Sequence, residues 1–347
     1  MEKNIINETN TTISNSKTME YNNVSKSNID QTGVETNNSN LDREAFLLEK
    51  KADNKLNPGC CLDTLFTSKT KRFEDACKLY KNAGDKYKMC NQWRKAASCY
   101  ENCSKIKISL KESPVKFYEE TFFCYSKANS VSNSQKIFEK MNNYLEREGE
   151  YFQVGKNNEN LAIKNENNEN YNEAIIYYSQ AYKYYEIEGK HESLKNKMQI
   201  KIGELMLVHN HPDAPSKVPM IMENIGKSYL KSPITKYTAK EFFGKAILSS
   251  IYYSDDISIG NEYINKYKSI DETFEDSSIY ILCCDISNSV NNNDINGLQN
   301  SINKYKEICE TDEFMINIFD KLVDKMKNLS SSRVTNNEDF NEEEDMK

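Results

Sequence analysis

Two lysines stand at the spacing that places charges on one side of a helix. Lys197 and Lys201 are four residues apart, so their ammonium groups project from the same helical face. Such a face can attract carboxylates on a partner, because lysine is a flexible cation that tolerates different partner geometries. It can equally do no more than keep the helix solvated, and the spacing alone does not decide between these two interpretations.

A second candidate site is an apolar loop next to basic residues. Residues 60–66 read CCLDTLF and follow the helix-breaking sequence NPG at 57–59, with neither helical nor strand periodicity. The loop either folds back on the neighbouring helices or forms an exposed patch that contacts a membrane or a partner. The second interpretation agrees with Lys69, Lys71 and Arg72, which follow directly and would favour anionic lipid headgroups.

The remaining reactive side chains lack the spacing of a metal or catalytic site. His209 and His211 lie in a proline-rich turn without a third ligand at a usable spacing. The 10 cysteines form no CxxC pair. Those on the apolar faces of expected helices are small core residues, namely Cys77, Cys99, Cys103 and Cys124. We therefore predict no metal, no cofactor and no enzymatic activity.

The composition is that of a soluble chain with polar ends. The 347 residues are 37% hydrophobic and 29% charged, with a formal net charge of −7, which argues against nucleic acid as the main partner. No apolar run approaches the roughly 18 to 20 residues that span a bilayer, and the N-terminus lacks an apolar signal segment. We expect a soluble, cytoplasmic protein.

The clearest pattern of structural elements lies in residues 73–103. Its first half places small and aromatic residues at the i, i+3, i+4 and i+7 positions of one helical face, and its second half repeats this pattern after a short polar break. Small residues fall where two helices must approach closely, and aromatic rings fall where their edges interlock. The stretch is expected to form a helical hairpin.

The same pattern returns at 118–128, 137–144 and 171–184, so a helix pair recurs roughly every 40 residues, as in tetratricopeptide-like solenoids. One hairpin cannot bury its apolar face alone, and we expect the pairs to stack into a twisted sheet of helices. The fold class is therefore predicted as all-α. The Asn-rich stretch at 157–170 weakens the pattern, and the hairpin there is expected to be loosened.

We expect four regions along the chain: a disordered Asn- and Ser-rich tail at 1–40, a helical-hairpin solenoid at 41–230, a C-terminal helical bundle at 231–330 and an acidic tail at 331–347. The first region has too few apolar residues to offset its chain entropy by burial. Aromatic and aliphatic residues return at helical spacing in the third region, which is why a bundle is expected there.

Three stretches of the chain resemble the soluble NSF-attachment proteins, the SNAP adaptors of membrane fusion. They are FEDACKLYKNAGDKYKMCNQWRKAASCY after the apolar loop, SPITKYTAKEFFGKA at 232–246 and the acidic end EEEDMK. The likeness extends from about residue 41 to the last residue. It looks closer to the alpha and beta type than to the gamma type, because the chain closes on a short acidic terminus. The resemblance implies hairpins followed by a bundle, without catalytic activity, that bridge SNARE bundles to the NSF ATPase.

The resemblance also implies roles for particular lysines. In the family, a stripe of lysines faces the acidic SNARE four-helix bundle, which contains syntaxin-like and other chains. These lysines correspond here to Lys127, Lys156, Lys197, Lys201 and Lys240. Exposed ion pairs contribute only about 0.2 to 1 kcal/mol each, so shape and summed charge would decide specificity.

Two more sites follow from the resemblance. The membrane loop of the family corresponds to Cys60, Cys61, Leu62, Leu65 and Phe66. The family carries phenylalanines where this chain has its two cysteines and Leu62, so membrane insertion is expected to be weaker or assisted by acylation of the cysteines.

The ATPase-stimulating site of the family is a large aliphatic residue in an acidic run next to the end of the chain. Met346 matches it, flanked by Glu344 and Asp345. The acidic cluster of the bundle that faces the ATPase falls on 289–294, which reads SVNNND and is mostly neutral. Part of the ATPase contact that the resemblance implies therefore lacks its usual charge here.

A different class of function also fits the repeats. A generic tetratricopeptide-like scaffold that captures a partner's peptide would explain the helical hairpins. It would explain neither the apolar loop nor the EEEDMK terminus, and for this reason we take the SNAP-like adaptor as the leading hypothesis.

Overall fold

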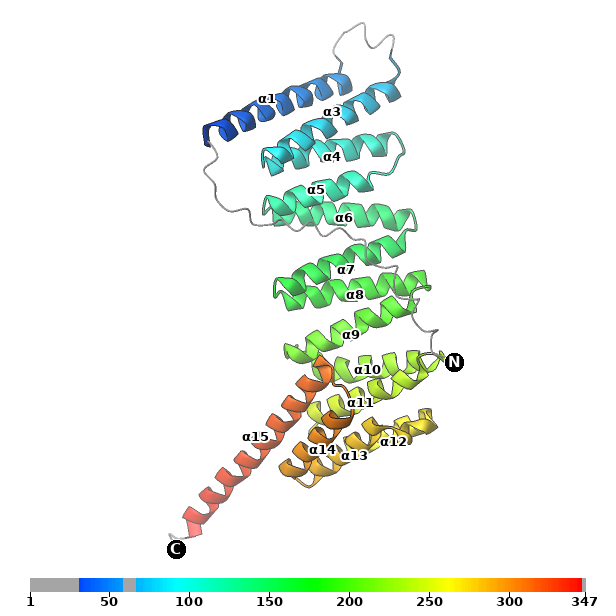
Figure 1. Ribbon diagram of the computed structural model, residues 1–347, viewed down its shortest axis with the longest axis vertical. Helices are drawn as coiled ribbons and strands as arrows, with labels where there is room; N and C mark the ends of the chain where they lie inside the picture. The colour runs from blue at the N-terminus through cyan, green and yellow to red at the C-terminus, as the bar shows by residue number, and fades with distance from the viewer. Residues whose placement is uncertain (1–30, 59–66, 345–347) are drawn as a thin grey trace, which may run out of the picture. The chain divides into compact units, whose positions relative to one another are not determined.

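The computed structural model describes residues 31–58 and 67–344, and it describes side chains within 38–58 and 67–329. Every regular element in these ranges is a helix, which confirms the predicted all-α fold class. The chain divides into two compact units, residues 1–137 and 138–347, and each is described by itself. Helices keep the labels of Figure 1.

The first unit consists of helices joined in antiparallel hairpins: α1 (Gln31–Leu56), α3 (Lys69–Met89), α4 (Trp93–Ser109), α5 (Val115–Lys127) and the first part of α6 (Val131–Arg147). The pair α3 and α4 confirms the hairpin predicted for 73–103. Small residues meet aromatic ones where the two helices cross, since a Cβ atom added at Gly84 would lie 2.9 Å from the ring carbon Cζ of Tyr100.

The first described helix begins earlier than the sequence pattern indicates. Apolar periodicity predicts a helix from about residue 41, whereas α1 begins at Gln31. Residues 31–40 are mostly polar, and a helix end without an apolar stripe gives no periodic signal. The N-terminus of α3 is capped, because Ser68 Oγ accepts a hydrogen bond of 3.2 Å from the backbone N–H of Lys71.

The second unit is also a succession of helices (Figure 1). Its elements after α6 are α7 (Tyr151–Asn167), α8 (Tyr171–Glu188), α9 (Glu192–Val208), α10 (Ala214–Leu230), α11 (Lys236–Tyr253), α12 (Ile259–Ile270), the short 3₁₀ helix η1 (Glu272–Asp276), α13 (Ser278–Asn291), α14 (Ile295–Ile308) and α15 (Glu313–Glu344). The short helices α12, α13 and α14 precede the long last helix α15. One hydrophobic cluster runs from Ala162 to Met326. The expected boundary between solenoid and bundle at 230/231 falls within this cluster and stays a prediction.

The Asn-rich stretch is a regular helix and turn, so the expected loosening of its hairpin is wrong. The amides of Asn158 and Asn165 donate hydrogen bonds to carbonyl groups one turn earlier, at 2.8 and 2.9 Å. Glu169 then takes a left-handed conformation with φ of 61°, and the N–H of Asn170 returns to the carbonyl of Asn165 at 2.9 Å. This is a Schellman-type helix end, and asparagine-rich segments can form it without losing the helix before it.

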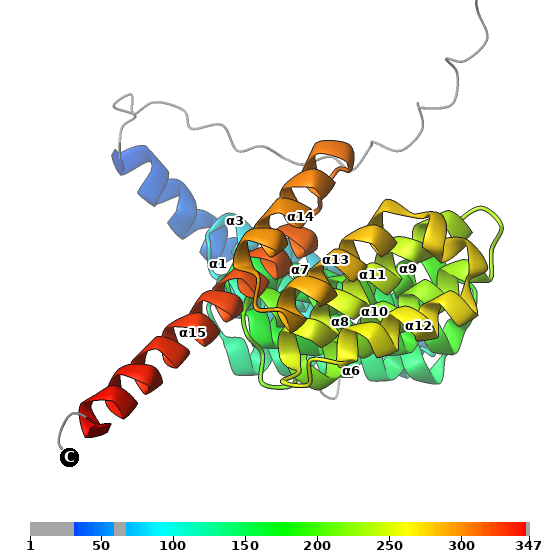
Figure 2. The same ribbon diagram turned by 90° about the horizontal axis from the view of Figure 1, so that it is seen from below.

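Lysines hold the last helix of the second unit, α15, against α11. Lys245 of α11 is buried and forms an ion pair with Asp312, which caps the start of α15. Lys325 of α15 donates to the carbonyl groups of Ile251, Tyr252 and Ser254 at the end of α11, at 3.1, 2.9 and 2.5 Å. Beyond this attachment α15 extends past α13 and α14 in both views (Figures 1 and 2).

Candidate functional site

Helix α9 carries the two lysines that the sequence singled out, and both are paired with carboxylates of α7. Lys197 Nζ lies 2.8 Å from Glu159 Oε1, and Lys201 Nζ lies 3.2 Å from Glu166 Oε1. Lys201 also lies 3.7 Å from Glu204 of its own helix. The lysine pair is therefore part of an ion-pair arrangement that joins two helices.

Tyrosines of α8, the helix between α7 and α9 in the chain, hold the same carboxylates from another side. The hydroxyl of Tyr185 donates to Glu159 Oε2 at 2.7 Å, and the hydroxyl of Tyr178 donates to Glu166. Each glutamate thus accepts hydrogen bonds from a tyrosine and a lysine. We name Glu159, Tyr185 and Lys197 the first rung, and Glu166, Tyr178 and Lys201 the second rung.

The first rung keeps its glutamate ionised. Burial alone would raise the pKa of Glu159, but hydrogen bonds from Lys197 and Tyr185, together with the charges of Lys197 and Lys156, lower it below its ordinary value. Burial and the bond to Glu159 raise the pKa of Tyr185, which keeps its hydroxyl protonated as a donor. The first rung is a compact group in which one glutamate accepts hydrogen bonds from a lysine and a protonated tyrosine.

The second rung has more carboxylates around it than the first. Burial would lower the pKa of Lys201, but the hydrogen bond that it donates to Glu166 and the charges of Glu166, Glu204 and Glu313 raise it above its ordinary value. Burial raises the pKa of Glu204, with Asp312 and Glu313 adding to the effect. Lys201 therefore faces several carboxylates, whereas Lys197 has a second cation near its glutamate.

The structure brings only some of the predicted SNARE-facing lysines together. Lys156 is exposed on α7 and acts electrostatically on Glu159, so it belongs to the surroundings of the first rung. Lys127 is in the other unit, where its Nζ lies 5.7 Å from the centre of the Phe123 ring. Lys240 of α11 is half-buried and donates to the carbonyl of Thr273 at 2.6 Å. Their role in binding stays a prediction.

Two other predicted sites lie largely outside the described residues. All five residues of the apolar loop do so, namely Cys60, Cys61, Leu62, Leu65 and Phe66. At the C-terminus Glu344 is the last residue of α15, while Asp345 and Met346 are beyond the described range.

The histidines serve as packing residues. His209 stacks on Tyr171 with ring centres 3.4 Å apart, and Nδ1 of His211 accepts a hydrogen bond of 3.1 Å from the N–H of Asp213. Within residues 31–58 and 67–344, no group of three or more histidine, cysteine or acidic side chains could hold a metal ion. Over the same ranges, no helix has the length and hydrophobicity needed to span a bilayer.

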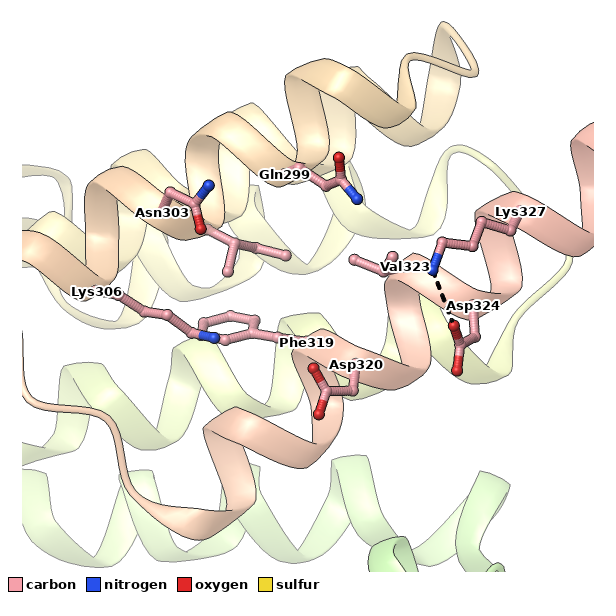
Figure 3. A pocket seen from close by; sticks show the side chains of 9 residues that line it. Gln299, Asn303, Lys306, Phe319, Asp320, Val323, Asp324 and Lys327 are labelled. Atoms are coloured by element: carbon pink, nitrogen blue, oxygen red, sulfur yellow. Dashed lines mark hydrogen bonds and ion pairs between the residues drawn. The ribbon is translucent and has the colours of Figure 1, made fainter.

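A groove of about 610 Å³ between α14 and α15 was not anticipated from the sequence (Figure 3). Its lining mixes apolar, amide, basic and acidic side chains: Gln299, Ile302, Asn303, Lys306, Phe319, Asp320, Val323, Asp324 and Lys327. Lys306 Nζ lies 5.6 Å from the centre of the Phe319 ring, and Lys327 pairs with Asp324 at 3.5 Å. Because both signs of charge are present, the groove favours neither an anion nor a cation, and we assign it no ligand.

The sequence reasoning missed the acidic half of the lysine site. Glu159 and Glu166 lie in the stretch that we interpreted as low complexity, so their helical register was not considered. A signal was available, since both residues fall on the face that also carries Ala162, at helical spacing. Treating asparagine as compatible with a helix would have placed them opposite the tyrosines of α8.

Comparison with known proteins gives the family. A family model described as soluble NSF attachment protein, SNAP, matches residues 43–327. The chain is 25% identical over 287 residues to the vesicular-fusion protein SEC17 of Komagataella phaffii, covering 82% of this chain and 96% of that protein. It is 24% identical over 288 residues to the alpha-soluble NSF attachment protein of Homo sapiens, covering 80% and 93%.

The chain therefore belongs to the soluble NSF attachment protein family. Its relatives include an alpha-type member from Vitis vinifera, 24% identical over 281 residues and covering 80% of this chain and 93% of that protein. A beta-type member from Bos taurus is 23% identical over 243 residues, covering 69% and 79%. These relatives confirm the predicted resemblance to the alpha and beta types.

Proposed function

We propose that this chain is a non-enzymatic adaptor that binds SNARE complexes and recruits and stimulates the NSF ATPase, which takes the complexes apart during vesicle fusion and intracellular transport. The observation that carries the proposal is the family match over residues 43–327. The names of the relatives support it, since one is a vesicular-fusion protein and others are NSF attachment proteins.

The lysines of the second unit would supply the SNARE contact. Lys156 and Lys197 are exposed, and Lys201 is half-exposed, so all three ammonium groups can reach a partner. A four-helix bundle with acidic residues on its surface presents many carboxylates, and several weak pairs add up to useful affinity without demanding one partner sequence. Binding of this kind weakens as salt rises, because exposed charges are screened.

The apolar loop and the C-terminus would make the remaining contacts, with the membrane and with the ATPase. We assign membrane contact to the apolar loop, with Leu62, Leu65 and Phe66 as the apolar anchors next to Cys60 and Cys61. Each anchor contributes at most a few kcal/mol on burial, about 1.5 to 3 for a fully buried side chain, so a single copy would hold a membrane weakly. The protein would accordingly be cytoplasmic and peripherally attached.

ATPase stimulation would come from the C-terminus. Glu344 and Asp345 provide a negative charge that steers the chain towards a basic surface, and Met346 provides a small apolar contact. Methionine can occupy a leucine-sized pocket because its unbranched thioether adapts to the space. On this basis Met346→Ala would keep SNARE binding and ATPase recruitment but lower stimulated hydrolysis.

The test is a binding experiment with purified SNARE complex and ATPase, with and without nucleotide. Replacing Lys156, Lys197 and Lys201 together by Glu should abolish SNARE binding while the helical circular dichroism signal stays unchanged. The matched control replaces exposed lysines elsewhere in the second unit by Glu, namely Lys217, Lys231 and Lys304. Retained binding by the first triple variant, or equal loss in the control, would refute the assignment.

A further inference from the structure

The two lysines of α9 already hold carboxylates of their own chain, and this limits how they can meet a partner. We propose that Glu159 and Glu166 act as internal competitors for the carboxylates of the acidic partner and so set how tightly it is held. The inference rests on the proposed function, because it assigns a regulation to the same lysine surface.

The competing carboxylates are more deeply buried than the lysines with which they pair. In the first rung the side chain of Lys197 is 56% exposed, and that of Glu159 is only 12% exposed. Tyr185 holds the other oxygen of Glu159 at 2.7 Å. A flexible cation is therefore paired with an anion that cannot turn away from it.

A partner carboxylate has two ways to reach Lys197. It can draw the ammonium group away from Glu159, which leaves that buried carboxylate with Tyr185 and the more distant charge of Lys156. It can also share the ammonium group, which brings two carboxylates close to one another, and like charges repel. Both routes cost part of the attraction between Lys197 and the partner carboxylate. Lys197 therefore binds that carboxylate less tightly than an unpaired lysine would.

The two rungs differ in how completely one glutamate controls its lysine. Glu159 is the carboxylate paired with Lys197, so removal of its charge releases that lysine. Lys201 is paired with both Glu166 and Glu204, and removal of one charge leaves the other carboxylate in place. The first rung should therefore respond more strongly to a single substitution than the second.

The experiment compares isosteric Glu→Gln variants, which keep an oxygen for the tyrosine hydroxyl and remove only the charge. The variants are Glu159→Gln and Glu166→Gln. The matched control is Glu223→Gln, because Glu223 is likewise paired with lysines and with a tyrosine, namely Lys227, Lys266 and Tyr267, none of which belongs to the predicted binding set. The probe is an assembled SNARE complex without membrane anchors, and its dissociation constant is measured over a series of salt concentrations.

Glu159→Gln should bind the SNARE complex about 1.5- to 5-fold more tightly than the wild type, the range expected when one exposed ion pair no longer has to be broken. Glu166→Gln should give a smaller gain, and Glu223→Gln should bind as the wild type does. The gain of Glu159→Gln should shrink as salt rises, because salt screens the competition as well as the attraction.

Unchanged or weaker binding by Glu159→Gln would overturn the inference, and so would an equal gain in Glu223→Gln. If Glu159→Gln unfolds, Glu166→Gln combined with Glu204→Gln releases Lys201 and provides the second measurement. The double variant Lys197→Ala, Lys201→Ala distinguishes a failure of the proposed function from a failure of this inference. Wild-type binding by that variant would refute the lysine surface of the proposed function, whereas weaker binding by it without a gain in Glu159→Gln would refute only the competition.

Discussion

Tyrosines are bonded to carboxylates in both units, and two of these arrangements, Tyr80 with Asp53 and Tyr185 with Glu159, differ in which helix supplies the lysine. In the first unit the hydroxyl of Tyr80 on α3 donates to Asp53 of α1 at 2.5 Å. Lys50, which pairs with Asp53 at 3.4 Å, belongs to the same helix as Asp53. The ion pair there is local to one helix.

In the second unit the corresponding lysine crosses the stack of helices. Glu159 lies on α7, its tyrosine on α8 and its lysine on α9. A local pair can form as soon as its helix forms, whereas this pair exists only when three helices are stacked. The comparison teaches that one packing device can be local to a helix or can join three helices, and the lysine to which the proposed function assigns partner binding belongs to the second kind.

The largest effect is expected for the cross-helix pair that attaches α15. Asp312→Asn keeps an oxygen to cap α15 but removes the charge that pairs with the buried Lys245, and breaking a buried pair in this way costs about 3 to 5 kcal/mol. Because the side chain of Asp312 is 50% exposed, we expect the lower end of that range. Hydrogen exchange in increasing urea would measure the loss, on α15 amides for Asp312→Asn and on α1 amides for the local control Asp53→Asn; equal losses in both variants would contradict the distinction between local and cross-helix pairs.

The hydrogen bonds from tyrosine to carboxylate should contribute equally to the free energy of unfolding in both units. Tyr87 donates to Glu49 at 2.9 Å in the first unit, and Tyr185 makes the equivalent bond in the second. We expect Tyr87→Phe and Tyr185→Phe each to lower the free energy of unfolding by about 1.5 to 3 kcal/mol, since each bond is to a charged group. Urea denaturation monitored separately in each unit would test this, and a loss confined to one unit would show that the device is not shared.

Acidification should distinguish the first rung from its neutral variant. The pKa of Glu159 is held below its ordinary value of 4.5, so its stabilising contribution is complete above that pH and is lost as the pH falls through the lowered pKa. The stability difference between the wild type and Glu159→Gln should therefore be constant near neutral pH and shrink below about pH 4.5. Urea midpoints from neutral to acidic pH give the measurement; a difference that grows on acidification would reverse the sign and refute the pKa direction.

The smallest effect on stability is expected for the lysine of the local pair. Lys50→Ala should change the free energy of unfolding by less than about 1 kcal/mol, because both side chains of its pair with Asp53 are exposed, whereas Lys197→Ala leaves the mostly buried carboxylate of Glu159 without its lysine and should cost more. Only Lys197→Ala should weaken binding of the SNARE complex. Thermal unfolding and binding measured on the same two variants would separate the roles, and similar binding by both would remove the special status of the cross-helix lysine.

Most of the fold could be read from periodicity, because the helices bury aromatic and small residues at regular spacing. The hairpin of α3 and α4 is an example, with Ala76, Tyr80, Ala96 and Tyr100 all buried. The start of α1 could not be placed in this way, since its first residues carry no apolar stripe. The Asn-rich helix α7 was misjudged because composition was weighed above register, although asparagine can bond to its own backbone inside a helix.

The sequence predicted the lysines of the candidate site but not its glutamates. Four-residue spacing and family resemblance both pointed to Lys197 and Lys201, but neither pointed to the glutamates that hold them. Contacts between helices that are not neighbours in the chain depend on how the hairpins stack, and sequence spacing within one helix carries no information about that. Glu159 and Glu166 therefore became visible only in the three-dimensional arrangement.

The attachment of α15 to α11 has a consequence for the order in which the protein is made. Lys325 bonds to carbonyl groups that precede it by 71 to 74 residues, so the end of α11 leaves the ribosome long before its capping group is synthesised. The first unit precedes α11 in the chain, and N-terminal units generally fold first during synthesis. The second unit is thus completed only after Lys325 has been synthesised, and a ribosome that stalls before this residue would leave the nascent chain with an uncapped α11.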